Sequence, residues 1–346
     1  MKKLRLLFVT ALSAISISYA QDKESPYFVK TYRSAEIQNV NVRTSGGSIT
    51  VIGQEGSEAR VEIYVKPNNW NGSSLSKSEI EERLREYELS VKKEGSTIYC
   101  VARRKNDSGW NNWKKSLNIS FKIYSPEKIS TDLQTSGGGI TLKDLTGNLS
   151  FSTSGGGLKL YNLGGNIKGR TSGGGIDITD SRDNIDVSTS GGGIDATNCK
   201  GDIRLVTSGG GLRLKRLNGM VKASTSGGGI RAEEIGGEFI TSTSGGSIHL
   251  EDITASVKAS TSGGGIHADI KSLGKYLSLS TSAGSITVRM PLDKGMNLDL
   301  DANRVRIPEI RNFNGRIEKD RVRGSVNGGG IPVTMDANSG SISIND

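Results

Sequence analysis

Apolar and polar positions alternate along this chain inside a repeat of 18 residues. The motif Thr-Ser-Gly-Gly-Gly-Ile, or a near variant of it, begins each repeat. Its first residues are Thr135, Thr153, Thr171, Thr189, Thr207, Thr225, Thr243 and Thr261, spaced by 18, and then Thr281, spaced by 20. A period of this size is typical of a solenoid, in which each repeat buries its apolar side only by stacking on its neighbours.

Two segments of each repeat alternate with a period of two, as 176–178 and 185–189 do. That period indicates β-strands, whereas no helical period occurs and glycine interrupts every coil. The sequence therefore predicts an all-β fold, namely a single-chain parallel β-helix (β-solenoid) with two short strands and two turns per 18-residue coil.

Stacking in register, with about 4.8 Å between coils, would align three inward columns. The first is Ile140, Leu158, Ile176, Ile194, Leu212, Ile230, Ile248, Ile266 and Ile286. The second is Leu149, Ile167, Ile185, Ile203, Val221, Phe239, Val257 and Leu277. The third is Leu145, Leu163, Ser181, Cys199, Leu217, Ile235 and Ile253. The motif threonines also point inward by this alternation, where their hydroxyls can bond turn amides or the next coil's threonine.

The middle glycine of the motif is the same in every repeat, whereas its neighbours vary to Ala283, Ser247 and Ser285. We expect a positive φ there, because a Cβ would strain such a turn. These structural turn glycines are Gly47, Gly138, Gly156, Gly174, Gly192, Gly210, Gly228, Gly246, Gly264 and Gly284.

The sequence divides the chain into a signal peptide (1–20), a first coil with a cap region (21–130), the regular solenoid (131–290) and a C-terminal part (291–346). The first coil covers 37–52, and a strand-rich cap protects the end of the stack from edge pairing. In the cap we expect strands at 60–66 and 117–124, a hairpin of 89–93 with 96–104, and one short helix at 79–88. The C-terminal part reads as an irregular Arg-rich insertion over 291–325, followed by two degenerate coils around 328–331 and 339–342.

That helix rests on a capping box formed by Ser78 and Glu81, and on an apolar stripe of Ile80, Leu84 and Tyr87.

The first 20 residues have the pattern of a secretory signal peptide. Lys2, Lys3 and Arg5 precede an apolar run over 6–17, and Ser18-Tyr19-Ala20 supplies the cleavage site. Gln21 follows in place of the cysteine of a lipoprotein anchor. We therefore expect export to the periplasm, the cell surface or the exterior, and no transmembrane segment in the mature chain.

The formal charge of +9 falls to +6 when the three cations of the signal peptide are removed. A basic excess favours anionic partners such as acidic polysaccharides, lipid head groups or cell-wall polymers, although a solvated surface explains a modest imbalance equally well. Nucleic acid fits poorly with export. Of the two cysteines, Cys199 reads as a core residue, and export leaves a disulfide with Cys100 open.

These elements together resemble the bacterial putative-adhesin family, a domain of unknown function with an adhesin-like parallel β-helix. The resemblance rests on the signal peptide, the first Thr-Ser-Gly-Gly-Ser-Ile coil, the strand-rich insertion, the strand at Tyr124-Ser125-Pro126 and the tandem Thr-Ser-Gly-Gly-Gly-Ile coils. It covers nearly all of the mature chain. It implies a right-handed helix and a cell-envelope location, and it transfers no active residues.

Aromatic residues in two Asn-rich loops form the first candidate site. Sugars bind flat aromatic faces and amides, so Trp70, Trp110, Asn111, Asn112 and Trp113 are candidate ligand-binding residues. The alternative is that these indoles pack the cap against the first coil.

Two further candidates lie in outward columns. His249 and His267 would be neighbours on adjacent coils, and with Glu251 and Asp269 they could hold a divalent metal, although a solvated ladder of mixed charge is the commoner outcome. A basic stripe on the opposite sheet could attract polyanions or be a solvated face. It consists of Lys168, Arg170, Arg204, Lys222 and Lys258, with Asp186 among them.

We expect a non-enzymatic binding or structural protein of the envelope that uses no cofactor and binds a glycan or an anionic polymer. The alternative is a β-helix lyase or hydrolase that acts on polysaccharide. Such an enzyme needs carboxylates in a groove built by long loops, whereas the turns here are short and Asp177 and Asp195 are expected on a flat sheet. A calcium-loaded repeat lacks its glycine pattern here, and an ice-binding face would need an outward threonine array.

Overall fold

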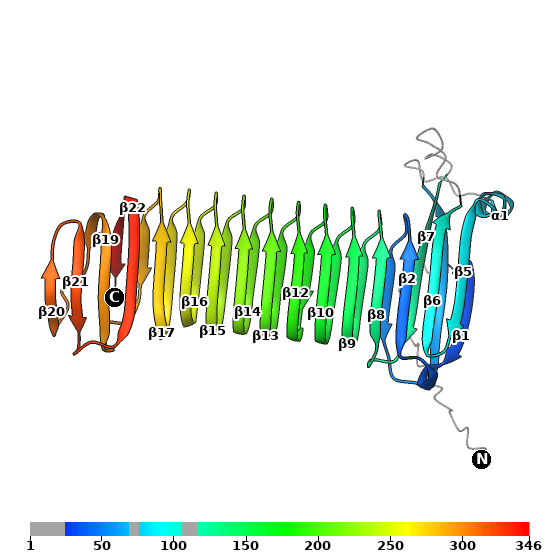
Figure 1. Cartoon of the computed structure of the whole chain (residues 1–346), viewed down its shortest axis with the longest axis horizontal. Coiled ribbons are helices and arrows are strands. Elements are labelled where there is room, and N and C mark those ends of the chain that lie inside the picture. The colour runs from blue at the N-terminus through cyan, green and yellow to red at the C-terminus, as the bar shows by residue number, and fades with distance from the viewer. Residues whose placement is uncertain (1–24, 69–75, 106–115, 346) are drawn as a thin grey trace, which may run out of the picture.

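The computed structural model describes residues 25–68, 76–105 and 116–345, and the repeats form an elongated stack (Figure 1). Strands of successive repeats lie side by side along the long axis, with the N-terminal strands at one end and the C-terminal strands at the other. The described residues are all-β apart from the helix α1 (Lys77–Leu84) and a 3-10 turn, η1 (Ser34–Glu36). An all-β fold is thereby confirmed, and the many consecutive strands are consistent with a solenoid.

The strands of the repeats pair in parallel and without a shift over most of the stack. They are β8 (Ser130–Thr135), β9 (Ile140–Thr153), β10 (Leu158–Thr171), β11 (Ile176–Thr179), β12 (Arg182–Thr189), β13 (Ile194–Thr207), β14 (Leu212–Thr225), β15 (Ile230–Thr243), β16 (Ile248–Thr261), β17 (Ile266–Thr281) and β18 (Ile286–Arg289). Ile167, for example, lies opposite Leu149 on one side and Ile185 on the other. Residues 18 apart in sequence are therefore direct neighbours.

Most repeats form one bent strand of 14 residues, which differs from the predicted pair of short strands. In most coils a glycine with a positive φ lies three residues after the bend, such as Gly147 (151°) or Gly165 (91°), and the bend itself occupies a residue with a positive φ, such as Asp144 (55°) or Asn162 (50°). Because hydrogen bonding to the neighbouring coils continues on both sides of this residue, the predicted second turn does not interrupt the strand. Within the described coils from 140 to 281, only the coil of β11 and β12 is divided, on either side of 180–181.

All three predicted apolar columns are buried. Two further columns complete the core, because the alternation continues for two more residues in each segment. One consists of Leu142, Leu160, Ile178, Ala196, Leu214, Ala232, Leu250, Ala268 and Val288. The other consists of Phe151, Val187, Leu205, Ala223, Thr241, Ala259 and Leu279.

The motif threonines are buried as predicted and connect neighbouring coils. The Thr153 hydroxyl donates to the Gly138 carbonyl of the preceding coil at 2.7 Å and accepts from the Gly156 amide at 3.4 Å. The bond to the turn amide matches the expectation, but the partner on the adjacent coil is a glycine carbonyl and not a threonine. The same two bonds recur in most coils, so the hydroxyl there satisfies two backbone groups at the corner.

The expected positive φ at the middle glycine is wrong. No middle glycine from Gly47 to Gly284 is among the positive-φ residues of the described chain. Stacking is the reason for glycine here: a Cβ on Gly192 would lie 2.3 Å from the Gly174 oxygen and 2.5 Å from its carbonyl carbon. The peptide of one coil therefore rests directly on the peptide of the next.

The N-terminal region continues the stack and then ends it with antiparallel strands. Its strands are β1 (Phe28–Arg33), β2 (Asn39–Thr44), β3 (Ile49–Gly53), β4 (Glu58–Pro67), β5 (Tyr87–Glu94), β6 (Thr97–Arg104) and β7 (Leu117–Ser125). The first coil, formed by β2 and β3, pairs in parallel with β8 and β9, as predicted. On its other side β2 pairs with β6 and β3 with β7. The antiparallel strands β5, β4 and β1 then complete this end.

The helix begins two residues earlier than predicted. Ser76 is its N-cap and forms the capping box with Glu79, so the proposed box of Ser78 and Glu81 is wrong. The predicted apolar stripe faces inward: Ile80 is half-buried, Leu84 packs partly buried against the core, and Tyr87 is buried, although Tyr87 belongs to β5 and not to the helix. Capping, which satisfies backbone groups of the first turn, defines its start.

The C-terminal part is more regular than predicted. It contains β19 (Met296–Arg306), β20 (Phe313–Ile317), β21 (Arg321–Val326) and β22 (Ile331–Asn345). In place of two degenerate coils, β22 forms one coil between β17 and β18 on one side and β19 on the other. In place of an irregular insertion, β21 pairs antiparallel with both β19 and β20. The stack therefore ends in antiparallel strands at both ends.

Candidate binding surfaces

The predicted aromatic site lies outside the described residues. Trp70, Trp110, Asn111, Asn112 and Trp113 all fall within 69–75 and 106–115. A sugar site at these loops therefore stays a prediction.

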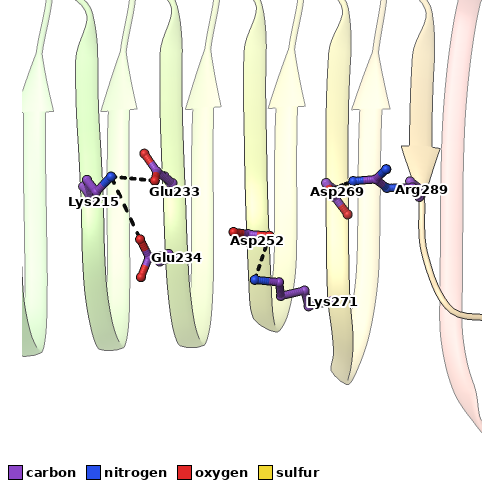
Figure 2. Close-up of polar contacts among 7 residues, drawn as sticks. All are labelled: Lys215, Glu233, Glu234, Asp252, Asp269, Lys271 and Arg289. Carbon is purple, nitrogen blue, oxygen red and sulfur yellow. Dashed lines mark hydrogen bonds and ion pairs between the residues drawn. The ribbon is translucent and has the colours of Figure 1, made fainter.

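Ion pairs join successive coils along one face of the stack (Figure 2). Lys215 Nζ lies 2.5 Å from Glu233 Oε1 and 4.0 Å from Glu234 Oε1. Lys271 Nζ lies 2.9 Å from Asp252 Oδ1, and this hydrogen bond raises the pKa of Lys271. Because these side chains are largely exposed and solvated, the pairs contribute little to stability. This face is a solvated ladder of mixed charge.

The predicted metal group is not assembled on this ladder. His249 and His267 are neighbours, with ring centroids 6.2 Å apart and planes inclined by 42°. Asp269, however, is ion-paired with Arg289 of the next coil (Figure 2). Within the described ranges, no group of three or more His, Cys, Asp or Glu side chains could hold a metal ion. The predicted ligands His249, Glu251, His267 and Asp269 therefore do not form such a group. Arg289, which lies in register with Asp269 on the next coil, is paired with the carboxylate that a metal cation would need.

A groove of about 690 Å³ runs along the Thr-Ser corners of the N-terminal coils, and we call it the serine groove. It is lined by Arg43, Thr44, Ser45, Arg103, Gln134, Thr135, Ser136, Ser152, Thr153, Ser154, Arg170, Thr171, Ser172, Ser188, Thr189, Ser190, Val206 and Ser208. The serine after each motif threonine is exposed, and in-register stacking aligns these hydroxyls at the coil spacing of about 4.8 Å. The lining contains three arginines and no carboxylate.

Two of these arginines are neutralised by acids outside the groove. Arg43 lies 2.5 Å from Asp132, and Arg103 lies 2.6 Å from Glu88. Arg170 is exposed and has no ion-pair partner among the described residues. It lies between Ser152 and Ser188 of the adjacent coils, so a guanidinium stands within a row of hydroxyls.

The rest of the predicted basic stripe is less continuous. Asp186 lies between Lys168 and Arg204 in register and pairs with Arg204 at 3.1 Å. Lys222 and Lys258 lie farther along the same column, and neither lines the serine groove. Arg170 is the one member of the stripe that reaches the groove, a position that the sequence pattern alone did not indicate. The sequence feature that could have indicated the serine groove is the serine that follows every motif threonine.

The two cysteines are free and buried, so the disulfide left open by the sequence is not formed. Burial raises the pKa of the Cys100 thiol to about 12 and that of Cys199 to about 11. Neither thiol is therefore a nucleophile at neutral pH. Cys199 occupies the third core column, as predicted.

Comparisons with known proteins leave the family unassigned. No protein-family model matches the chain, and no curated protein is significantly similar to it. One similar solved structure, from Clostridium sporogenes ATCC 15579, is named a putative cell adhesion protein (13% identity, 92% of this chain and 97% of that one covered, TM-score 0.19). Another, from Bacteroides fragilis NCTC 9343, is named a putative adhesin (12% identity, 92% and 96% covered, TM-score 0.25). Both TM-scores are too low for these likenesses to carry a conclusion.

The described residues include no helix that is long and apolar enough to cross a membrane.

Proposed function

We propose that the chain is an exported, non-enzymatic, right-handed parallel β-helix of the bacterial cell envelope. In this proposal it is an adhesin-like rod that binds acidic glycans along the serine groove. The export rests on the signal-peptide pattern and on the family resemblance, and the handedness rests on the resemblance alone.

The observation that carries the ligand class is the composition of the serine groove. Its hydroxyls can exchange hydrogen bonds with those of a sugar, and the unpaired Arg170 offers a planar pair of donors to a carboxylate or sulfate. The corners repeat at about 4.8 Å, so they suit an extended polymer better than a compact substrate. The described carboxylates that face solvent are paired with cations in several places, such as Asp269 with Arg289, which is unfavourable for acid-base chemistry.

The proposal is tested with the mature chain and three immobilised polymers: alginate, dextran sulfate and neutral dextran. We expect binding to the two acidic polymers that weakens as salt is added, and none to neutral dextran. Arg170→Ser should weaken binding roughly tenfold, because a hydrogen-bonded ion contact is lost while the serine matches Ser152 and Ser188.

Lys258→Ser is the matched control, because it removes one positive charge from the same sheet outside the groove. It should change binding less than twofold, on the order expected of a distant screened charge. Equal binding to neutral dextran, or equal losses in the two variants, would contradict the assignment of the groove.

A further inference from the structure

The strand β20 (Phe313–Ile317) is an open edge at the C-terminal end of the stack (Figure 1). Among the described residues it pairs only with β21. Its residues 314–317 are exposed, and Ile317 retains 58% of its accessible surface, whereas Phe313 is half-buried against the core. A strand with an unpaired edge and largely exposed residues is a template for another strand.

The hydrogen bonds that flank β20 define which backbone groups point outward. The Asn327 amide donates to the Asn312 carbonyl at 3.1 Å, and the Glu318 amide donates to the Arg321 carbonyl at 2.7 Å. In an antiparallel pair, alternate residues face the partner strand, so 314 and 316 bond to β21 as 312 and 318 do. The amides and carbonyls of Phe313, Gly315 and Ile317 therefore point away from the sheet.

The opposite end of the stack is better protected. There the edge strand β1 carries Lys30, whose ammonium donates to the Val91 carbonyl of the other edge strand, β5, at 2.9 Å. An edge lysine is one of the features that discourage pairing with another chain, as is proline. The sequence of β20, Phe-Asn-Gly-Arg-Ile, contains neither, and its one charged side chain, Arg316, is paired with Glu318 at 3.5 Å.

We propose that β20 pairs antiparallel with β20 of a second copy of this chain, about a twofold axis at Gly315. In this register Gly315 lies opposite Gly315, and Phe313 lies opposite Ile317. All three outward residues of each copy then exchange amide-carbonyl hydrogen bonds, two for each facing pair. Any other twofold register leaves at least one of these residues unpaired.

The side chains of β20 suit this register. Phe313 meets the exposed Ile317 of the other copy, which is a favourable aromatic and β-branched cross-strand pair. Arg316 lies opposite Asn314, so no like charges face each other. The interface uses the same patch on both copies, so assembly stops at the dimer. Twofold dimers of this kind are the commonest soluble homo-oligomers. The result is a double-length rod with an N-terminal cap at each far end, whose two ends can act with avidity.

The first test is the mass of the full mature chain by light scattering and sedimentation velocity over a concentration series. We expect a dimer for the wild type. Ile317→Pro should weaken the dimer at least roughly tenfold, because each copy loses one outward donor. The Ile317 amide does not bond to β21, so the variant keeps its own sheet, which an unchanged circular dichroism melt checks. Met220→Lys, which alters an exposed apolar residue on the side of the stack, is the control and should stay dimeric.

The second test fixes the register. Asn314 and Arg316 of opposite copies form a close pair, with Cα atoms about 4.5 Å apart, within reach of a disulfide. Mixed Asn314→Cys and Arg316→Cys proteins should cross-link under mild oxidation far faster than either alone, and the native cysteines are buried. A monomeric wild type, a dimer that survives Ile317→Pro, longer head-to-tail oligomers, or no preference for the mixed cross-link would overturn the proposal. The readout is mass, so it does not depend on glycan binding.

Discussion

Replacing the middle glycine of one internal coil tests why that residue is glycine. In Gly192→Ala the new Cβ would lie 2.3 Å from the Gly174 oxygen and 2.5 Å from both the Gly174 carbon and the Gly175 nitrogen. All three are backbone atoms that cannot rotate away. Because carbon contacts are comfortable only at about 3.5 Å, the two coils must separate locally by about 1 Å.

The hydrogen bonds at this corner set the cost of that separation. They are the bonds from the Gly191 amide to the Ser172 carbonyl (2.8 Å), from the Ile176 amide to the Gly193 carbonyl (3.0 Å) and from the Thr189 hydroxyl to the Gly174 carbonyl (2.7 Å). At about 1 kcal/mol each, their loss lowers the free energy of unfolding by about 3 kcal/mol.

Gly191→Ala is the matched control. Its Cβ would lie 3.2 Å from the nearest atom, and Ala283 already occupies the same position of the last repeat. We expect a loss of less than about 1 kcal/mol. Urea denaturation followed by circular dichroism measures both variants. Hydrogen exchange over 170–195 shows local opening, which a stacked array permits without global unfolding. Indistinguishable stability and exchange in the two variants would refute the stacking explanation.

Three further predictions concern buried threonine and cysteine side chains. Thr189→Val removes a hydroxyl that bonds to Gly174 and should cost about 1–3 kcal/mol by thermal denaturation, whereas Thr131→Val removes a buried hydroxyl without a partner and should be neutral or stabilising. Equal effects would contradict this. Cys100 and Cys199 should resist alkylation at pH 8 until the chain unfolds; rapid labelling of the native protein would contradict their burial. Because burial raises both thiol pKa values, to about 12 and about 11, above the ordinary 9.0, stability should fall as pH rises above 9 towards those values.

The core was predictable from sequence because strand alternation and an 18-residue period together determine which side chains meet. Ile167 could be placed between Leu149 and Ile185 from spacing alone. The origin of the glycine requirement was not predictable, since a positive φ and a close backbone approach both exclude a side chain. The bends were missed because residues as different as Asp144 and Arg216 adopt them.

Boundaries failed where the sequence offered two equivalent readings. Ser76 with Glu79 and Ser78 with Glu81 have the same capping spacing, and only the structure distinguishes them. The strand β20 was not predictable because its alternation is only five residues long and has a glycine at its centre, which does not distinguish it from a loop.

The serine groove was missed for a different reason. Ser136 and its equivalents are single residues 18 apart in the sequence, and they form one surface only because the coils stack. Arg170 was identified as one cation of a stripe, but its place between two serines depends on the register of three coils.

The distance between spin labels on the exposed corner serines tests most directly whether successive repeats lie directly above one another. Ser136 and Ser262 are seven repeats apart, and Ser136 and Ser208 are four repeats apart. With about 4.8 Å per coil, the two pairs of Cα atoms should be about 34 Å and about 19 Å apart. Double electron-electron resonance on the two double-cysteine variants should therefore give distances that differ by about 14 Å. Distances that do not grow with the number of intervening repeats would contradict the stack and every surface that depends on it.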